Sequence, residues 1–299
     1  MQQYLALCKV VEVGSFSKAA DILGYSQSGI SQMVQSVEEE FEMKLLHRSR
    51  SGVKLTIEGQ KLLPYIQALV NDFQAMRAKG AELKGLESGL IRIGTISSVS
   101  GYWLPAIIKE FQQLHPGVQF ILHQGDYDSI PEWTRIGEID FGFVNPAAVS
   151  GLKTQFLKKG NMLAVLPKDH RLAAQEVVSL QQLAQEPFLL VESGSYSEPL
   201  EAFRAAGLTP DIKLCIHDDY SILAMVEAGL GVSILAELML KKIKGYAVCI
   251  RPIAPAVQRD IGVVYKDLST MPIASRRFLT YLQEHVPGSE PADPPPGGK

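Results

Sequence analysis

The most restrictive feature of this sequence is an apolar stripe with helical spacing that follows a turn. Within residues 26–41, apolar side chains recur at steps of four, three and four, and about 100° of rotation per residue places them on one helix face. The stripe consists of Ile30, Val34, Val37 and Phe41. Ser26 can cap this helix, since its hydroxyl can accept from the open amides of the first turn. Gly14 is expected to end a first helix, residues 17–23 to form a second and Gly24 to begin the turn, which together predict a helix-turn-helix.

The face opposite this stripe is polar, short and uncharged. Its side chains both donate and accept hydrogen bonds, which suits base edges in the major groove of DNA, where Gln pairs with adenine and Ser with several bases. A solvated helix surface is the alternative, because Ser and Gln are common on surfaces. The candidate base-reading residues are Ser26, Gln27, Ser28, Ser31, Gln32 and Gln35.

Charge is separated in the segment that follows. Residues 43–57 contain four basic side chains and no acid, and four glutamates at 38–40 and 42 precede them. The whole chain has 29 basic and 32 acidic side chains and a net charge of −3, which excludes a globally basic coat protein for nucleic acids. A polyanion must therefore be bound locally, by a basic hairpin on the phosphates with the acidic helix end pointing away. The candidate phosphate contacts are Lys18, Arg48, Arg50 and Lys54.

These residues carry a family resemblance. Over about sixty residues without a gap, the sequence resembles the winged helix-turn-helix of LysR-type transcriptional regulators. The matching segments are Gly14–Ala20, Leu23, Ser26–Gln32, Val37-Glu38, Leu45–Thr56 and Gly59. The resemblance implies that residues 1–56 form a domain that binds double-stranded DNA. Three residues depart from the family pattern: Gly29 replaces the usual Ala, Gln32 a frequent Arg or Lys, and Glu42 the usual Gly.

A long helix with a heptad seam is predicted after this domain, from residue 57 to about residue 84. The helix is too long for a domain of fifty-odd residues, which favours a partner chain, although packing on its own domain is the alternative. The resemblance implies antiparallel dimerisation through this linker, and tetramers. Residues 57–89 are therefore expected to comprise this linker and a hinge at 84–89. The seam residues are Leu62, Ile66, Leu69, Phe73 and Met76.

Residues 90–286 alternate strand and helix patterns, which predicts an α/β domain with parallel sheets covered on both faces. The resemblance continues here and implies a periplasmic-binding-protein-like effector domain. It is expected to have two lobes, lobe I at about 90–161 and 266–286 and lobe II at about 162–265. A helix over 275–285 would complete lobe I. The segments that carry the resemblance include Leu104-Pro105, His115–Val118, Gly137–Asp140, Leu166–Leu172 and Glu227–Val232.

A ligand in open α/β sheets binds beyond the carboxyl ends of the strands. The segment 95–101 is expected to be such a loop, and its hydroxyls and the amides of the following helix would favour a carboxylate or another anion, although serines there can equally be plain caps. No Arg or Lys is evident in the cleft, which favours a small polar or singly charged metabolite. With the positions that the resemblance adds, the candidate effector-binding residues are Ser97, Ser98, Val99, Ser100, Gly125, Asn145, Pro146, Ser193, Ser195, His217 and Asp218.

No enzyme signature is present. The sequence lacks Gly-x-Ser-x-Gly, His-Glu-x-x-His, Cys-x-x-Cys and the phosphate-binding Gly-x-x-x-x-Gly-Lys, and its six histidines are scattered, so neither catalysis, a metal nor a cofactor is expected. The three cysteines, Cys8, Cys215 and Cys249, are expected to be buried thiols, with a redox pair between the last two as the alternative.

The expected location is the cytosol, with no membrane span. No apolar run approaches the ~18 residues of a span, and the first 13 residues carry Lys9 and Glu12 where a secretory signal needs an apolar core. The Pro- and Gly-rich segment 287–299 is expected to be disordered. The sequence thus predicts a transcriptional regulator controlled by a small-molecule effector. The alternative is a cytosolic small-molecule-binding protein or enzyme on the same scaffold, with an N-terminal domain that binds another protein.

Overall fold

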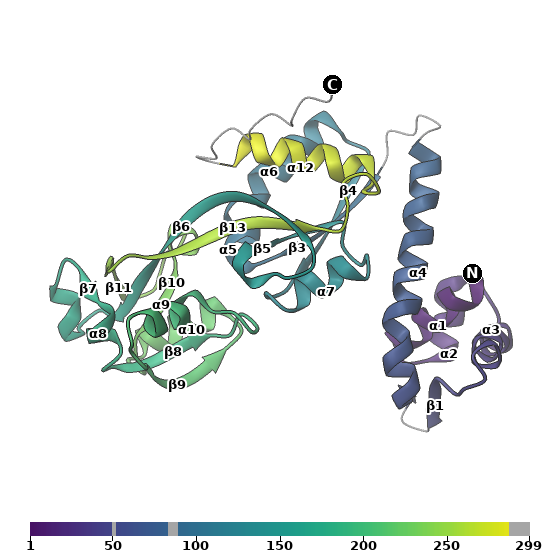
Figure 1. Ribbon diagram of the computed structural model, residues 1–299, viewed down its shortest axis with the longest axis horizontal. Helices are drawn as coiled ribbons and strands as arrows, with labels where there is room; N and C mark the ends of the chain where they lie inside the picture. Colours follow the sequence, from purple (N-terminus) through teal and green to yellow (C-terminus); the bar gives the residue numbers. More distant parts are fainter. Residues whose placement is uncertain (50–51, 83–88, 287–299) are drawn as a thin grey trace. The chain divides into compact units, whose positions relative to one another are not determined.

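The computed structural model describes residues 1–49, 52–82 and 89–286, and the chain divides into two compact units. The first contains all elements through the long helix and also residues 135–138, and the second contains the remaining residues from 89 onward (Figure 1). Three predicted features lie outside the described residues: Arg50, most of the hinge at 84–89, and the tail at 287–299.

The N-terminal unit has the predicted helix-turn-helix, hairpin and long helix. Its elements are α1 Gln2–Val13, α2 Phe16–Leu23, α3 Gln27–Glu40, β1 Leu46–Ser49, β2 Gly52–Leu55 and α4 Ile57–Glu82. Gly14 and Gly24 end the first two helices with φ of 65° and 73°, a left-handed conformation that glycine adopts without steric cost. Ser26 caps α3 as predicted, since its Oγ accepts the Gly29 amide at 3.1 Å.

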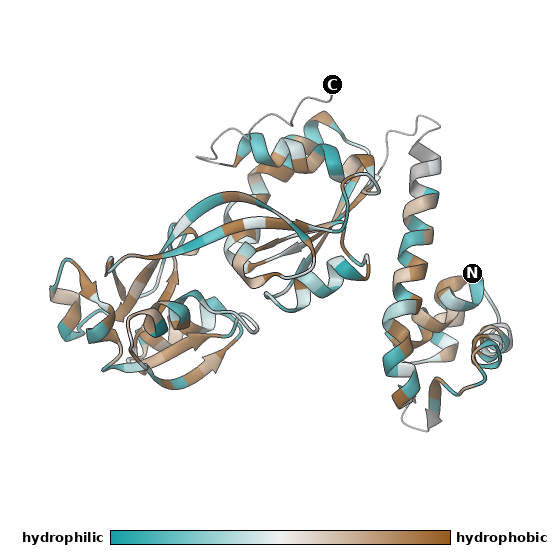
Figure 2. Cartoon of the chain, in the orientation of Figure 1, coloured by the Kyte–Doolittle hydropathy of each residue, from teal (hydrophilic) through white to brown (hydrophobic). Residues whose placement is uncertain are grey.

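The predicted stripe forms the core of this unit. Ile30, Val34 and Val37 on α3 are buried against apolar residues of α1 and α2. Ile66 on α4 joins the same core, with Leu62 packed against it. The hydrophilic face of α3 remains on the outside, and Figure 2 shows this helix largely in teal. Burial of this single stripe therefore fixes which face of α3 meets solvent.

The second unit alternates strands and helices. Its first half contains β3 Gly89–Thr95, α5 Ser97–Tyr102, α6 Leu104–Leu114, β4 Val118–Gln124, α7 Ser129–Arg135, β5 Phe141–Val144, η1 Pro146–Ala148 and β6 Lys153–Pro167. The remainder contains η2 Arg171–Ala174, β7 Val178–Ser179, α8 Leu180–Leu183, β8 Pro187–Val191, α9 Glu198–Ala205, β9 Asp211–Ile216, α10 Asp219–Glu227, β10 Ser233–Ala236, α11 Glu237–Leu240, β11 Val248–Arg251, β12 Ile253–Ala254, β13 Val257–Tyr265 and α12 Ile273–His285.

Its main sheet is mixed, so the prediction of purely parallel sheets is wrong. Among the described residues the strand order is β10-β6-β13-β5-β3-β4, with β11 also pairing β6. β3 pairs β4 and β5 in parallel, whereas β13 pairs both β5 and β6 antiparallel. β6 and β13 are long and run together through both lobes (Figure 1). Charged and polar residues at exposed positions interrupt the apolar pattern of both strands, which is why most of their length cannot be predicted from the sequence.

Lobe I has an aromatic core that includes the C-terminal helix. Phe278 of α12 meets Phe111 of α6 in an edge-to-face contact with ring centroids 5.0 Å apart. The ring centroid of Phe120 on β4 lies 4.9 Å from that of Phe278. Phe141 and Phe143 of β5 are fully buried in the same cluster. The helix predicted at 275–285 is therefore present as α12, and it packs in this aromatic core.

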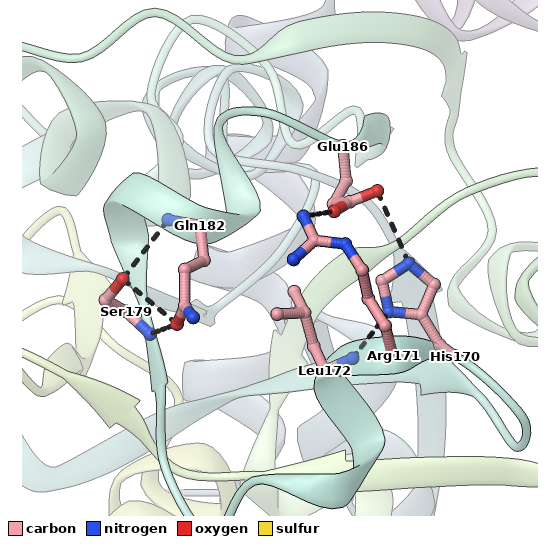
Figure 3. A network of polar contacts seen from close by, with 6 residues as sticks. All are labelled: His170, Arg171, Leu172, Ser179, Gln182 and Glu186. Atoms are coloured by element: carbon pink, nitrogen blue, oxygen red, sulfur yellow. Dashed lines mark hydrogen bonds and ion pairs between the residues drawn. The ribbon is translucent and has the colours of Figure 1, made fainter.

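Lobe II is held together at its edge by a polar network (Figure 3). Glu186 accepts from the Arg171 guanidinium and pairs with Nε2 of His170 at 3.4 Å. Because Nδ1 of His170 accepts the Leu172 amide at 3.3 Å, Nε2 is the nitrogen that carries the proton. Ser179 and Gln182 form a reciprocal capping box at the start of α8. These contacts fix the turn around η2 and thereby the edge of the lobe.

Candidate nucleic-acid interface and effector cavity

The polar face of α3 is exposed. Ser26, Gln27, Ser28, Gln32 and Gln35 all lie on the surface, and Ser31 is half-buried. The Ser26 and Ser28 hydroxyls are 3.0 Å apart, and the Gln35 amide donates to Glu39 at 2.7 Å. The structure thus brings the predicted base-reading side chains together on one helix face.

The predicted phosphate contacts are only partly described. Lys18 on α2 and Lys54 on β2 are exposed. Lys54 lies opposite His47, which is also exposed, in the hairpin ladder. Arg48 lies on β1, opposite Val53. Two of the proposed cations are therefore seen at the surface, on two different elements.

Glu38 does not point away with the other glutamates, so that part of the charge-separation prediction is wrong. Its carboxylate is buried and accepts from the Lys44 ammonium at 2.7 Å and from the amides of Leu45 and Leu46 at 2.9 and 3.2 Å. Burial raises the pKa of Glu38, but these donors outweigh it and hold the pKa below its ordinary value. Glu38 therefore ties the start of the hairpin to α3.

The predicted seam of α4 divides into two parts. Leu62 and Ile66 pack on the core of their own domain, so here the alternative of intramolecular packing applies. Further along, Leu69 and Met76 are exposed at 45% and 60%, and Phe73 is half-buried. Tyr65, 74% exposed, precedes Leu69 by one turn. These residues make an apolar stripe that runs from Tyr65 to Met76 along the helix.

The second unit contains a small cavity of about 60 Å³ between its lobes. Its lining includes five of the predicted effector-binding residues: Ser97, Ser98, Gly125, Ser193 and His217. Ser97 and Ser98 begin α5, Gly125 follows β4, and Ser193 and His217 follow β8 and β9. The expected arrangement at the carboxyl ends of parallel strands is therefore present.

The other predicted positions do not line this cavity. Because 97–102 is a helix and not a loop, Val99 faces the core, where it is fully buried, and the Ser100 hydroxyl donates to the Ser97 carbonyl. Asp218 caps α10 through the Ser221 amide at 2.9 Å. Ser195 bonds the Asp128 carboxylate, and Asn145, followed by Pro146 in η1, is buried behind the lining.

A buried arginine in the lining contradicts the expectation that the cleft holds no Arg or Lys. Arg259 on β13 donates from Nε to the Tyr127 hydroxyl at 2.8 Å and from a terminal nitrogen to Ser98 at 3.2 Å. Its Nε lies 3.4 Å from Glu198, which also accepts from Tyr127 at 2.7 Å and from Asn145 at 3.1 Å. These contacts join lobe I to lobe II.

Electrostatics in this network follow from burial and charge. Burial lowers the pKa of Arg259, but Tyr127, Glu198 and Asp219 together hold it above its ordinary value. Burial raises the pKa of Tyr127 and, in the same way, that of Asp219, which accepts a hydrogen bond from Ser97. Arg259 therefore stays charged. The sequence signal that could have located Arg259 is the alternation of Val257, Ile261 and Val263, which places Arg259 on the apolar face of a strand.

The prediction of buried thiols is wrong for Cys215 and holds only in part for the other two cysteines. Cys8 and Cys249 are partly buried, whereas Cys215 on β9 is exposed. Burial and the Glu192 carboxylate raise the pKa of Cys215, which disfavours a reactive thiolate.

Within the described ranges, no three His, Cys, Asp or Glu residues gather in a way that could hold a metal ion. No helix in the described part of the chain has the length and apolarity to cross a membrane.

Comparison with known proteins identifies the family. Residues 1–60 match the model for bacterial regulatory helix-turn-helix proteins of the lysR family, and residues 84–287 match the LysR substrate binding domain. An uncharacterized HTH-type transcriptional regulator of Bacillus subtilis, YvbU, is 31% identical over 284 residues, which cover 94% of this chain and 97% of YvbU.

Solved structures agree in fold. The crystal structure of CbnR, a LysR family transcriptional regulator, matches with a TM-score of 0.71 at 20% identity, over 95% of this chain and 98% of CbnR. Full-length CbnR complexed with its target DNA matches with a TM-score of 0.70, also at 20% identity, over 95% of this chain and 99% of that one.

The chain belongs to the LysR family of transcriptional regulators. The predicted family, its helix-turn-helix and its two-lobed α/β effector domain are confirmed, and the regulator is favoured over the alternative of a binding protein or enzyme with an appended domain.

Proposed function

We propose that α3 reads bases in the major groove, with the hairpin and α2 on the flanking phosphates. The observation that carries this assignment is the exposed, uncharged face of α3, capped by Ser26, in a domain whose hairpin presents Lys54 to solvent. Its readers would be Ser26, Gln27, Ser28, Ser31, Gln32 and Gln35, with Lys18, Arg48, Arg50 and Lys54 on phosphates. The related fold of CbnR in complex with its target DNA supports this use of the domain.

The apolar stripe from Tyr65 to Met76 on α4 supports self-association. We assign Leu69, Phe73 and Met76 to a dimer seam in which two α4 helices pack antiparallel, and two dimers to a tetramer. Leu62 and Ile66, the first part of the predicted seam, would contribute by fixing α4 on its own domain.

The cavity between the lobes is the proposed effector site. A small molecule bound there would shift the population of lobe arrangements and so the spacing of the two recognition helices. The working boundaries are 1–56 for DNA binding, 57–89 for the linker and hinge, and 90–286 for the effector domain. A regulator of this kind acts in the cytoplasm beside the chromosome and needs no catalysis.

The test compares two variants on a promoter fragment and on fragments with single base changes in it, over a range of salt concentrations. Lys54→Ala should weaken binding to all DNA and lower the salt slope by about 0.9, the value for one lost phosphate contact. Gln32→Ala should leave the slope unchanged and alter the preferred sequence. Lys213→Ala, an exposed lysine of the effector unit, is the matched control and should change neither. Equal losses with an unchanged slope would contradict the assignment.

A further inference from the structure

Acidic side chains outnumber basic ones in the lining of the cavity. Among its described lining residues, Asp126, Glu192, Glu198 and Asp219 can carry negative charge, whereas Arg259 is the one permanent cation. His217 can add positive charge only when it is protonated. The lining of the cavity therefore has more side chains that can carry negative charge than permanent cations.

The charge of Arg259 is already matched within the protein. Glu198 lies 3.4 Å from its Nε, Tyr127 and Ser98 accept its hydrogen bonds, and Asp219 adds a second negative charge nearby. A ligand carboxylate at this guanidinium would compete with Glu198 and be repelled by Asp219. Arg259 is therefore poorly suited to capture an anion.

Two of the four acids are each engaged by several protein donors at once. Asp126 accepts from the Ser129 amide and hydroxyl at 2.7 and 2.8 Å and from the Asp128 amide at 3.0 Å. Glu198 is held by Arg259 and by the donors from lobe I described above. These two carboxylates serve the fold and leave little hydrogen-bonding capacity for a ligand.

Glu192 and Asp219, at the lobe II side of the cavity, have fewer protein donors than the other two acids. Glu192 faces the His217 imidazole at 3.2 Å, and both side chains are accessible, 47% and 70% exposed. Asp219 accepts a hydrogen bond from Ser97, and burial raises the pKa of its carboxyl. A cation placed between the two carboxylates would favour their charged forms and supply donors to oxygens that have spare lone pairs.

We propose that the effector of this chain is a small organic amine whose protonated nitrogen binds Glu192 and Asp219, with Ser98 and Ser193 contacting its polar groups. The inference rests on the proposed function of the cavity as the effector site. It replaces the expectation of a carboxylate effector, because the sequence alone does not place Arg259 and its counter-ions in the cavity.

The test uses three probes of matched chain length and different charge: 1,4-diaminobutane, 4-aminobutyrate and succinate. Each is added to the full-length protein at equal ionic strength, and thermal unfolding is followed. A ligand at a hundredfold excess over its Kd stabilises by about 2.7 kcal/mol and should raise Tm by roughly 5–11 °C for a domain of this size. We expect this rise with the diamine, a smaller one with 4-aminobutyrate and none from succinate at this site.

Variants assign the effect to the cavity. Glu192→Gln and Asp219→Asn should each abolish most of the rise with the diamine, whereas Glu176→Gln, an exposed carboxylate outside the lining, should retain it. Because Glu192 is half exposed, its variant should fold even if Asp219→Asn does not. No rise with the diamine, or an equal rise in the Glu192→Gln protein, would overturn the proposal. The salt-slope test on α3 and the hairpin involves no ligand, so it would stand or fail separately.

Discussion

Removal of the Arg259 charge should destabilise the effector unit more than any exposed substitution. Arg259 and Glu198 are only 11% and 6% exposed, and their charged atoms lie 3.4 Å apart. Arg259→Met keeps much of the side-chain volume but leaves the Glu198 carboxylate buried without its cation. Breaking one side of a buried pair costs about 3–5 kcal/mol. Tyr127 and Asn145 still donate to Glu198, which favours the lower end of that range.

A thermal scan and a double-mutant cycle measure this cost. About 3 kcal/mol corresponds to a fall in Tm of roughly 6–12 °C for a unit of about two hundred residues. Glu198→Gln keeps hydrogen-bonding atoms in place and leaves Arg259 with Asp219, so it should cost less, about 1–2 kcal/mol. In the Arg259→Met/Glu198→Gln double variant no carboxylate is left at position 198, and the two costs should fall short of additivity by about 1–3 kcal/mol.

Two results would refute this reasoning. One is a loss below about 1 kcal/mol for Arg259→Met, which would mean that solvent reaches Glu198 in solution. The other is additivity within about 0.5 kcal/mol in the double variant, which would mean that the two side chains do not interact. Lys266→Met, an exposed cation just beyond β13, is the matched control and should change stability by no more than about 0.5 kcal/mol.

Three further predictions concern the N-terminal unit. Glu42 has φ of 52°, which strains a residue with a Cβ, so Glu42→Gly should raise the free energy of unfolding in urea by about 0.5–1 kcal/mol, whereas Glu42→Ala should not. Because the pKa of Glu38 is lowered in the folded protein, its stabilising contribution is complete above the ordinary carboxyl pKa of about 4.3 and is lost as the pH falls through the pKa of the folded state. Glu38→Gln should therefore make the free energy of unfolding less dependent on pH in this range. Phe73→Asp should give monomers in sedimentation velocity, whereas Gln74→Asp, exposed on α4, should not; an intact oligomer in the Phe73 variant would remove the seam.

The helix-turn-helix could be predicted because its determinants are local. Gly14, Gly24 and Ser26 set the helix ends through their own backbone and side-chain preferences, and the apolar spacing of α3 fixes its buried face. At Glu42, by contrast, the residue does not match the preference of the backbone position. The family pattern has Gly at this position, and the structure explains that choice by a left-handed φ.

The cavity could be predicted only in part, because its charges come from distant segments. Ser97, Gly125 and Ser193 follow recognisable strands, so chain order placed them at one edge. Arg259 lies on β13, and its partners Tyr127 and Glu198 are separated from it by more than sixty positions along the chain. No local pattern distinguishes such an arginine from an exposed one, since burial of a charge is decided by whether tertiary structure brings its counter-ion.

The position of Arg259 links ligand binding in the cavity to the arrangement of the two lobes. Its strand runs through both lobes, and the guanidinium contacts Ser98 and Tyr127 of lobe I while it faces Glu198 and Asp219 of lobe II. A ligand that draws Asp219 toward itself changes the charge balance around Arg259 and hence the relative stability of lobe arrangements. Since a ligand shifts an equilibrium only through its differential affinity for the two states, contacts with side chains that already join the lobes are the ones able to produce that difference.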